Sequence, residues 1–181
     1  MKPLLAALIC LFVSATAIAF DPLETEQKIQ HQDTEVEWKE DKIKIPDHIN
    51  SDDLQAFTVA GTDARFHYFI ERSSLVTGDD WVTRFVLVIR SNKGAVNSSY
   101  EGLRCGYRTY KVYAYGDANT LTPMPGAEWQ PIPRDDGDYR ATLYNDLVCN
   151  GLTGRPNSPA AVFQAMRTDH RVVSPFVDPA N

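Results

Sequence analysis

The clearest alternation of hydrophobic and polar residues in this chain runs from Trp81 to Arg90. Successive side chains of a strand point to opposite faces, and one face of this segment would carry Trp81, Phe85, Leu87 and Ile89, with Thr83 as its polar member. Each large side chain stabilises a fold by roughly 1.5–3 kcal/mol when fully buried, so this row predicts a core face. The opposite row is mixed and holds Val82, Arg84, Val86, Val88 and Arg90. We expect that face to be half covered, with both arginine heads in water.

A turn and a returning strand follow this segment. Asn92-Lys93-Gly94 supplies residues that tolerate positive φ, as short hairpin loops require. The chain then returns toward Cys105, which predicts a hairpin. Two further runs, 54–60 and 66–71, predict a second hairpin with a polar turn at 61–63, and the aromatic-rich run 107–115 predicts another strand.

Helical signals appear only after these strands. Within 139–149, Tyr139, Leu143 and Leu147 recur at helical spacing, which favours a helix, although a strand stays open as the alternative for this run. Ser158 is placed to cap a last helix and Pro159 to begin it, and that helix should end around 168–170. Strands followed by helices indicate an α+β fold, an antiparallel β-sheet with one or two C-terminal helices. A compact β-sandwich is the alternative.

The beginning of the chain has the features of a targeting signal. Residues 1–19 combine a basic start, an apolar run and an Ala17-Ile18-Ala19 cleavage pattern, so we expect a signal peptide that is cleaved after Ala19. A flexible polar lead would occupy 20–35, a single domain 36–175 and a tail 176–181, with Trp38 docking the start of the domain. No later apolar run approaches the about 20 residues that a transmembrane helix needs, so we expect no membrane span in the mature chain.

The expected cleavage of residues 1–19 determines which of the three cysteines remain in the mature protein. Cys10 lies inside the apolar run and would leave with the signal peptide, with lipidation of Cys10 as the alternative. Cys105 and Cys149 would then remain, and two cysteines in an oxidising compartment suggest a disulfide, with two free buried thiols as the alternative. The net charge of −6, without a clustered basic stripe, argues against a nucleic acid as the partner.

No arrangement of residues in the sequence is typical of a catalytic or metal site. The four histidines form no H-x-x-x-H pair and lie at no ligand spacing from a cysteine, and there is no G-x-S-x-G motif. Asp79-Asp80 and the acidic run 135–138 lack the spacing of a calcium loop, and we interpret them as solvated turns. We therefore predict no catalytic residue, no metal site and no cofactor.

Basic residues on neighbouring predicted strands form the strongest candidate binding site. These residues are Arg84, Arg90, Arg104 and Arg108, with Glu101 nearby. If the strand register brings them to one face, their guanidinium groups suit a carboxylate or a phosphate. The alternative, which we favour, is a ladder of ion pairs with Glu71 and Glu101 on a partly buried face.

The long proline-rich loop 116–138 is a second candidate surface. A loop of this length inside a compact domain is either functional or contains short elements, and we expect Trp129 to hold it against the domain. The candidate binding residues are therefore Arg84, Arg104, Glu101 and Trp129.

The run from Ser74 to Tyr115 resembles the CNP-one-like family of secreted Gram-negative bacterial proteins. The likeness rests on the segment Ser99–Cys105, on Arg84–Ser91 and on the turn 94–97, and it continues through 113–116, Trp129 and Cys149. The chain differs from the family pattern at 79–81 and around Cys149. The resemblance implies an exported single domain with a paired cysteine, and it brings no reaction, cofactor or substrate with it.

These observations together predict a periplasmic, non-catalytic binding or assembly module whose partner is an envelope protein or another envelope component. One alternative is an envelope hydrolase with a site assembled from His67, Glu71, Glu101 and Arg104. Another is a small-ligand carrier with a cavity lined by Tyr107, Tyr110, Tyr113 and Tyr115.

Overall fold

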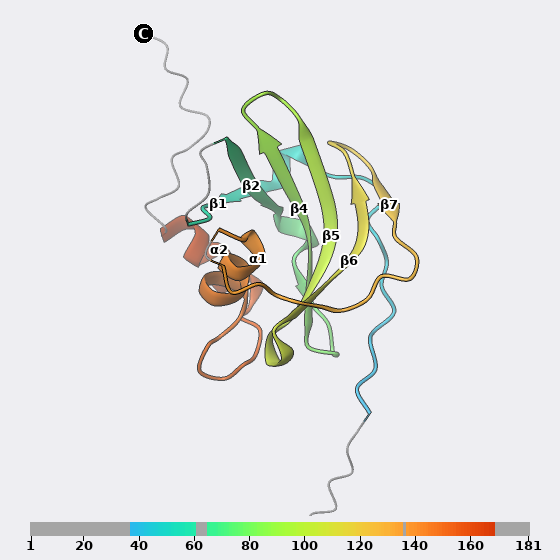
Figure 1. The fold of residues 1–181 in the computed structure, drawn as a ribbon, viewed down its shortest axis with the longest axis vertical. Coiled ribbons are helices and arrows are strands. Elements are labelled where there is room, and N and C mark those ends of the chain that lie inside the picture. The colour runs from blue at the N-terminus through green and yellow to red at the C-terminus, as the bar shows by residue number, and fades with distance from the viewer. Residues whose placement is uncertain (1–36, 61–64, 136, 169–181) are drawn as a thin grey trace, which may run out of the picture. The chain divides into compact units, whose positions relative to one another are not determined.

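The computed structural model describes residues 37–60, 65–135 and 137–168 (Figure 1). Its strands form one antiparallel sheet in the order β1-β2-β4-β5-β6-β7, with β3 paired to β4 and β8 paired to β6. The strands are β1 Leu54–Phe57, β2 Phe66–Glu71, β3 Val76–Thr77, β4 Val82–Ser91, β5 Val96–Arg104, β6 Thr109–Gly116, β7 Leu121–Pro123 and β8 Gln130–Pro131. The helices are α1 Tyr139–Thr142, a π-helical continuation Leu143–Val148, and α2 Pro159–Thr168, with 3-10 turns at Ser51–Asp53, Arg72–Ser74 and Cys105–Tyr107. The predicted antiparallel sheet with C-terminal helices is confirmed.

The sheet is covered on both faces. On one face, Phe85, Leu87 and Leu103 pack against buried residues of the π-helical segment and α2, and these helices lie together on one side of the sheet (Figure 1). On the other face, a second cluster is covered by the segment that precedes β1, through Ile43, Ile45 and Ile49; its sheet residues are Phe69, Val86, Val88, Tyr100, Tyr113 and Ala114. We call these the helix face and the strap face, and call residues 38–49 the strap.

The central hairpin forms as predicted, with one correction in each row. Strands β4 and β5 pair from Val82↔Arg104 to Arg90↔Val96, and Gly94 takes a φ of 87° in the turn. Trp81 does not join the core face, because it precedes β4, has a φ of 60° and is 55% exposed. Arg84 does not reach water and is only 4% exposed, because the strap covers that half of the sheet.

The remaining elements are largely confirmed. Strands β1 and β2 pair as a hairpin, although β1 ends at Phe57 and the predicted turn at 61–63 lies outside the described residues. Strand β6 begins at Thr109 because a 3-10 turn and Arg108, with a φ of 51°, come before it. A helix, not a strand, occupies 139–148. Helix α2 begins at Pro159 and ends at Thr168, and the Ala161 amide donates to the capping Ser158 Oγ at 3.3 Å.

The long loop 116–138 contains the short strands β7 and β8, and Trp129 packs edge-on against Trp38 with ring centroids 6.1 Å apart. This confirms that Trp129 holds the loop to the domain and that Trp38 docks the strap. The expected signal peptide, polar lead and tail lie outside the described residues, so the domain boundaries stay predictions.

Candidate functional site

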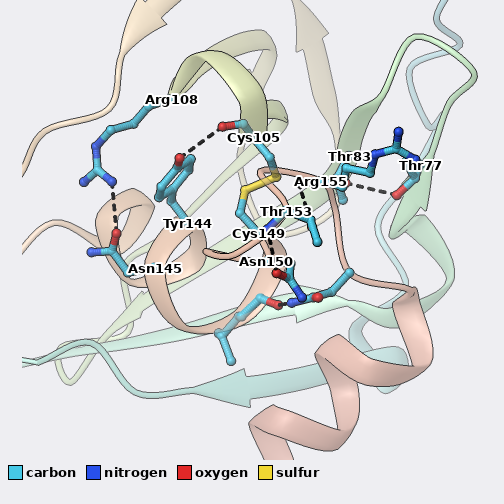
Figure 2. Close-up of a disulfide and its surroundings, with 12 residues drawn as sticks. Thr77, Thr83, Cys105, Arg108, Tyr144, Asn145, Cys149, Asn150, Thr153 and Arg155 are labelled. Atoms are coloured by element: carbon cyan, nitrogen blue, oxygen red, sulfur yellow. Dashed lines mark hydrogen bonds between the residues drawn. A yellow bond between two sulfur atoms is a disulfide. The ribbon is translucent and has the colours of Figure 1, made fainter.

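The predicted disulfide joins Cys105, directly after β5, to Cys149, directly after the π-helical segment (Figure 2). The Tyr144 hydroxyl donates to the Cys105 carbonyl at 3.0 Å, which ties the same two elements a second time. Cys149 also forms a β-bridge with Pro156, so the loop between them is closed at its base. The Asn150 amide donates to the Arg155 carbonyl at 2.8 Å within that loop. The disulfide therefore fixes the position of Arg155 relative to the end of the sheet.

A shallow hollow of about 220 Å³ opens beside this disulfide. Four separate segments meet there: the start of the strap, the turn before β4, the turn after β5 and the loop 150–155. Its lining residues are Trp38, Asp80, Trp81, Arg104, Cys105, Gly106, Tyr107, Gly154, Arg155 and Pro156. We call it the Trp–Arg hollow.

Arg104 lies between aromatic rings in this hollow. Its guanidinium carbon is 3.6 Å from the ring centroid of Trp38, 4.1 Å from that of Tyr107 and 5.3 Å from that of Trp129. Cation–π contacts of this kind contribute about 0.5–2 kcal/mol each, depending on exposure. Tyr107 is 68% exposed, so this group of rings reaches the surface. Arg104 is thus held in place by aromatic contacts at the surface of the domain.

Trp81 also lines the hollow, and its backbone is strained. A φ of 60° in a bulky residue is rare, and such conformations cost of order 1–3 kcal/mol. The turn that imposes it is closed by hydrogen bonds from the Gly78 amide to the Val82 carbonyl and from the Trp81 amide to the Gly78 carbonyl. The guanidinium of Arg155 lies 4.7 Å over the Trp81 ring. The turn therefore keeps a large apolar ring in solvent, next to a second arginine.

The lining residue Asp80 forms a buried ion pair with Arg84. Arg84 Nη1 donates to Asp80 Oδ1 at 3.1 Å, and Nη2 donates to the second carboxylate oxygen. Trp38 Nε1 donates to the Asp80 carbonyl at 3.0 Å. Burial alone would raise the pKa of Asp80, but hydrogen bonds from Arg84 and from the Asp41 and Val82 amides outweigh it and hold that pKa below its ordinary value. The interpretation of Asp80 as part of a solvated turn is wrong, because its carboxylate is enclosed by the strap and Arg84.

The strap is fixed by a second set of polar contacts. Glu40 accepts from Lys111 Nζ at 2.9 Å and from the Tyr113 hydroxyl at 2.7 Å. Partial burial tends to raise the pKa of Glu40, but these two donors and the Lys111 charge lower it overall. Burial, together with the bond to Glu40, raises the pKa of Tyr113 far above its usual range, so Tyr113 remains a hydroxyl donor. Trp38, at the start of the strap, is positioned by this network.

Glu101 lies on the helix face, away from the hollow. It pairs with Phe85 in the sheet register and is 0% exposed. Arg140 donates to it from Nε at 2.8 Å and from Nη2 at 3.0 Å. The Ser99 and Tyr139 hydroxyls each donate to Oε1 at 2.7 Å. Burial, and then the charge of Glu101, raises the pKa of Tyr139 well above its usual range.

The four candidate binding residues are therefore divided by the fold. Arg104 and Trp129 meet in one cluster, Arg84 lies on the same face but is buried in its ion pair, and Glu101 lies on the opposite face. Binding by these residues stays a prediction. The predicted ladder of ion pairs with Glu71 and Glu101 is wrong for the described residues: Arg84 pairs with Asp80, and Glu101 pairs with Arg140. Glu71 instead accepts a hydrogen bond from the Asn50 amide.

The structure does not assemble the hydrolase set. His67 pairs with Arg90 in the sheet, whereas Arg104 pairs with Val82, eight positions earlier on β4 (90 − 82 = 8). At about 3.3 Å per residue this separation is about 26 Å.

The carrier tyrosines are divided as well. Tyr107 lines the Trp–Arg hollow, Tyr113 a second hollow and Tyr110 with Tyr115 a third. The second hollow, of about 380 Å³, has Lys111 as its charged lining residue, and Lys111 is already paired with Glu40.

Sequence reasoning missed two members of the hollow, Trp81 and Arg155. Trp81 was assigned to the core face by its place in an alternating row. The turn-forming residues Gly78-Asp79-Asp80 directly precede Trp81. They indicate that the backbone of Trp81 belongs to a turn and not to the strand. The flanking residues Gly154 and Pro156 indicate that Arg155 lies in a loop. They do not indicate which distant residues Arg155 contacts. Its position depends on the disulfide.

A family model described as the CNP1-like family matches residues 33–167. The chain is also similar to Cryptic neisserial protein 1 from Neisseria gonorrhoeae (strain ATCC 700825 / FA 1090), at 30% identity over 126 residues. That match covers 61% of this chain and 60% of the relative, so the chain aligns with less than two thirds of the relative's length. No solved structure matches the chain. Across the described residues, no helix has the length and apolar character needed to cross a membrane.

Proposed function

The chain belongs to the CNP1-like family, and from this premise we propose that it is an exported protein of the bacterial cell envelope that acts as a non-catalytic binding module, with the Trp–Arg hollow as its contact surface. Export is supported by the signal-peptide pattern of residues 1–19 and by the disulfide, which persists in oxidising compartments. A periplasmic location follows from that leader. The partner is an envelope protein or another envelope component.

One observation carries the binding role: all three tryptophans of the chain gather at the hollow. Trp38 and Trp81 line it, and Trp129 packs against Trp38 and Arg104. Tryptophan, tyrosine and arginine are the residues that contribute most often to binding energy at protein interfaces. A domain of this size has no structural need to leave a strained tryptophan in solvent, and strain of this kind concentrates at functional sites.

The size of the hollow favours a macromolecular partner over a free small molecule. Sites for small molecules have volumes of about 300–1,000 Å³, and the Trp–Arg hollow has about 220 Å³. This space accommodates one or two anchoring side chains of a larger partner. Leu152 lies on the loop that carries Arg155 and is 99% exposed.

Site-specific photo-crosslinking tests the binding role. Tyr107 is replaced by the aromatic photo-crosslinker p-benzoylphenylalanine, and the protein is expressed at native level in the producing cell. Lys93, exposed in the hairpin turn at the far end of β4, receives the same replacement as the control. We expect one reproducible crosslinked species at Tyr107 and none at Lys93. Equal yields at the two positions would contradict the proposal.

Cell fractionation tests the export. We expect the protein in the periplasmic fraction with Phe20 as its first residue. A protein that keeps residues 1–19 and stays with the cytoplasmic fraction would refute this part.

A further inference from the structure

We propose that the occupant of the Trp–Arg hollow is an acidic polypeptide segment, which places a carboxylate on Arg104 and Arg155 and inserts a neighbouring apolar or aromatic side chain between Trp38, Trp81 and Tyr107. This inference rests on the proposed binding function and specifies the chemistry of its partner.

The first observation in favour of an acidic partner is the positive charge of the hollow. Asp80 lines it, but that carboxylate is enclosed and paired with Arg84. The exposed formal charges of the lining residues are therefore the two guanidinium groups of Arg104 and Arg155. Among the residues that the structure describes, neither has a carboxylate within ion-pair distance, whereas Arg84, Lys111 and Arg140 are all paired.

The second observation is the contact of both arginines with aromatic rings. Aromatic rings lie within cation–π distance of both guanidinium groups, at 3.6 Å and 4.1 Å from the Arg104 guanidinium carbon and 4.7 Å from that of Arg155. The guanidinium group carries a planar fork of N–H donors that binds a carboxylate through two parallel hydrogen bonds, and contacts with rings restrict its motion. Preorganised side chains lose little conformational entropy on binding. Both arginines are therefore suited to bind a planar anion such as a carboxylate.

The net charge of the chain does not oppose this assignment. The whole chain carries −6, yet exposed charges farther away than about 8–10 Å are screened at physiological ionic strength. The electrostatic energy of a carboxylate in the hollow therefore depends mainly on Arg104 and Arg155.

The backbone around the hollow suits an extended peptide. Gly106 and Gly154 belong to the lining, and neither places a side chain over the hollow. Gly154 takes a φ of 65°, so its glycine is required by the turn itself, and the space around it is open. The rim therefore leaves room for an extended segment beside the aromatic residues.

Selection from a random library of peptides of about 12 residues tests the chemistry directly. The library is displayed on phage and selected against the mature, oxidised protein. We expect enriched peptides to carry Asp or Glu next to an aromatic or large apolar residue. Titration of a synthetic enriched peptide is followed by intrinsic fluorescence, since all three tryptophans surround the hollow. Replacement of its acidic residues by Asn or Gln should weaken binding at least tenfold.

Variants of the protein separate the arginines of the hollow from arginine in general. Arg104→Gln and Arg155→Gln should each weaken binding of the acidic peptide at least tenfold, and raised salt should weaken it further. Arg90→Gln is the matched control, because Arg90 also stacks on a ring, that of Phe69 at 5.0 Å, but lies at the other end of β4. Binding by the Arg90 variant should equal that of the parent.

Three outcomes would overturn this inference. Enriched peptides without acidic residues would do so, as would an equal loss of binding in the Arg90 variant. Arg104-dependent binding to purified peptidoglycan sacculi, with no acidic peptide selected, would assign the hollow to peptidoglycan. In each case a crosslink at Tyr107 would leave the proposed binding function standing, whereas its absence would remove that function independently.

Discussion

Replacing Glu101 with Gln removes the one negative charge from a buried network on the helix face. Glu101 is 0% exposed and accepts four hydrogen bonds, two of them from Arg140, whose side chain is 14% exposed. Loss of one member of a buried ion pair costs about 3–5 kcal/mol, because the other charge stays buried without compensation. Domains of this size have unfolding free energies of about 5–15 kcal/mol, so we expect Glu101→Gln to remove a large fraction of the stability.

Equilibrium unfolding in urea, followed by far-ultraviolet circular dichroism, measures this change. Glu128→Gln is the matched control, since Glu128 is exposed and its replacement should change the unfolding free energy by at most about 0.5 kcal/mol. The double variant Glu101→Gln/Arg140→Met removes both charges, and we expect it to be more stable than the sum of the single effects predicts by about 2 kcal/mol or more. A loss below about 1 kcal/mol for Glu101→Gln would refute the structural role and return Glu101 to the list of binding candidates.

Three further predictions concern the disulfide, acid and the strained turn. Replacing Cys105 and Cys149 by Ser should lower the unfolding free energy by about 4 kcal/mol in urea, as expected for a loop of 44 residues, and a loss under about 1 kcal/mol would contradict this. Because the pKa of Asp80 is lowered on folding, its contribution is fully present above its ordinary value of 3.8 and is lost as pH falls below it; Asp80→Asn should flatten the stability profile in acid, and an unchanged profile would count against the ion pair. Trp81→Gly should be more stable than Trp81→Ala by about 0.5–1 kcal/mol in thermal or urea unfolding, since only Gly adopts a φ of 60° without strain; the reverse order would exclude the strain.

Local patterns in the sequence predicted most of the sheet and both helices. The turn at Gly94 and the alternation of β4 determine the central hairpin, and the Ser158-Pro159 start determines α2. These elements depend on neighbours in sequence, which is why periodicity and turn chemistry identify them. The alternation failed at Trp81 because a tight turn, and not a strand, sets its backbone.

Burial of polar residues could not be predicted in the same way. Arg84 is buried because the strap, whose Glu40 lies 44 residues earlier (84 − 40 = 44), covers its face. Glu101 is buried because Arg140 arrives from a helix 39 residues later. The candidate site shows the same division. Arg104 and Trp129 were identified by residue type, but their contact, and the presence of Arg155 near Trp81, depend on loops that the disulfide and the strap bring together.

The central claim is that Arg104 serves binding while the buried arginines serve the fold. The most direct test is the yield of the Tyr107 photo-crosslink in the Arg104→Gln variant, after urea unfolding has shown that its stability lies within about 2 kcal/mol of the parent. We expect that the variant stays folded and that its crosslink falls to the background seen at Lys93. A folded variant with an unchanged crosslink would contradict the claim.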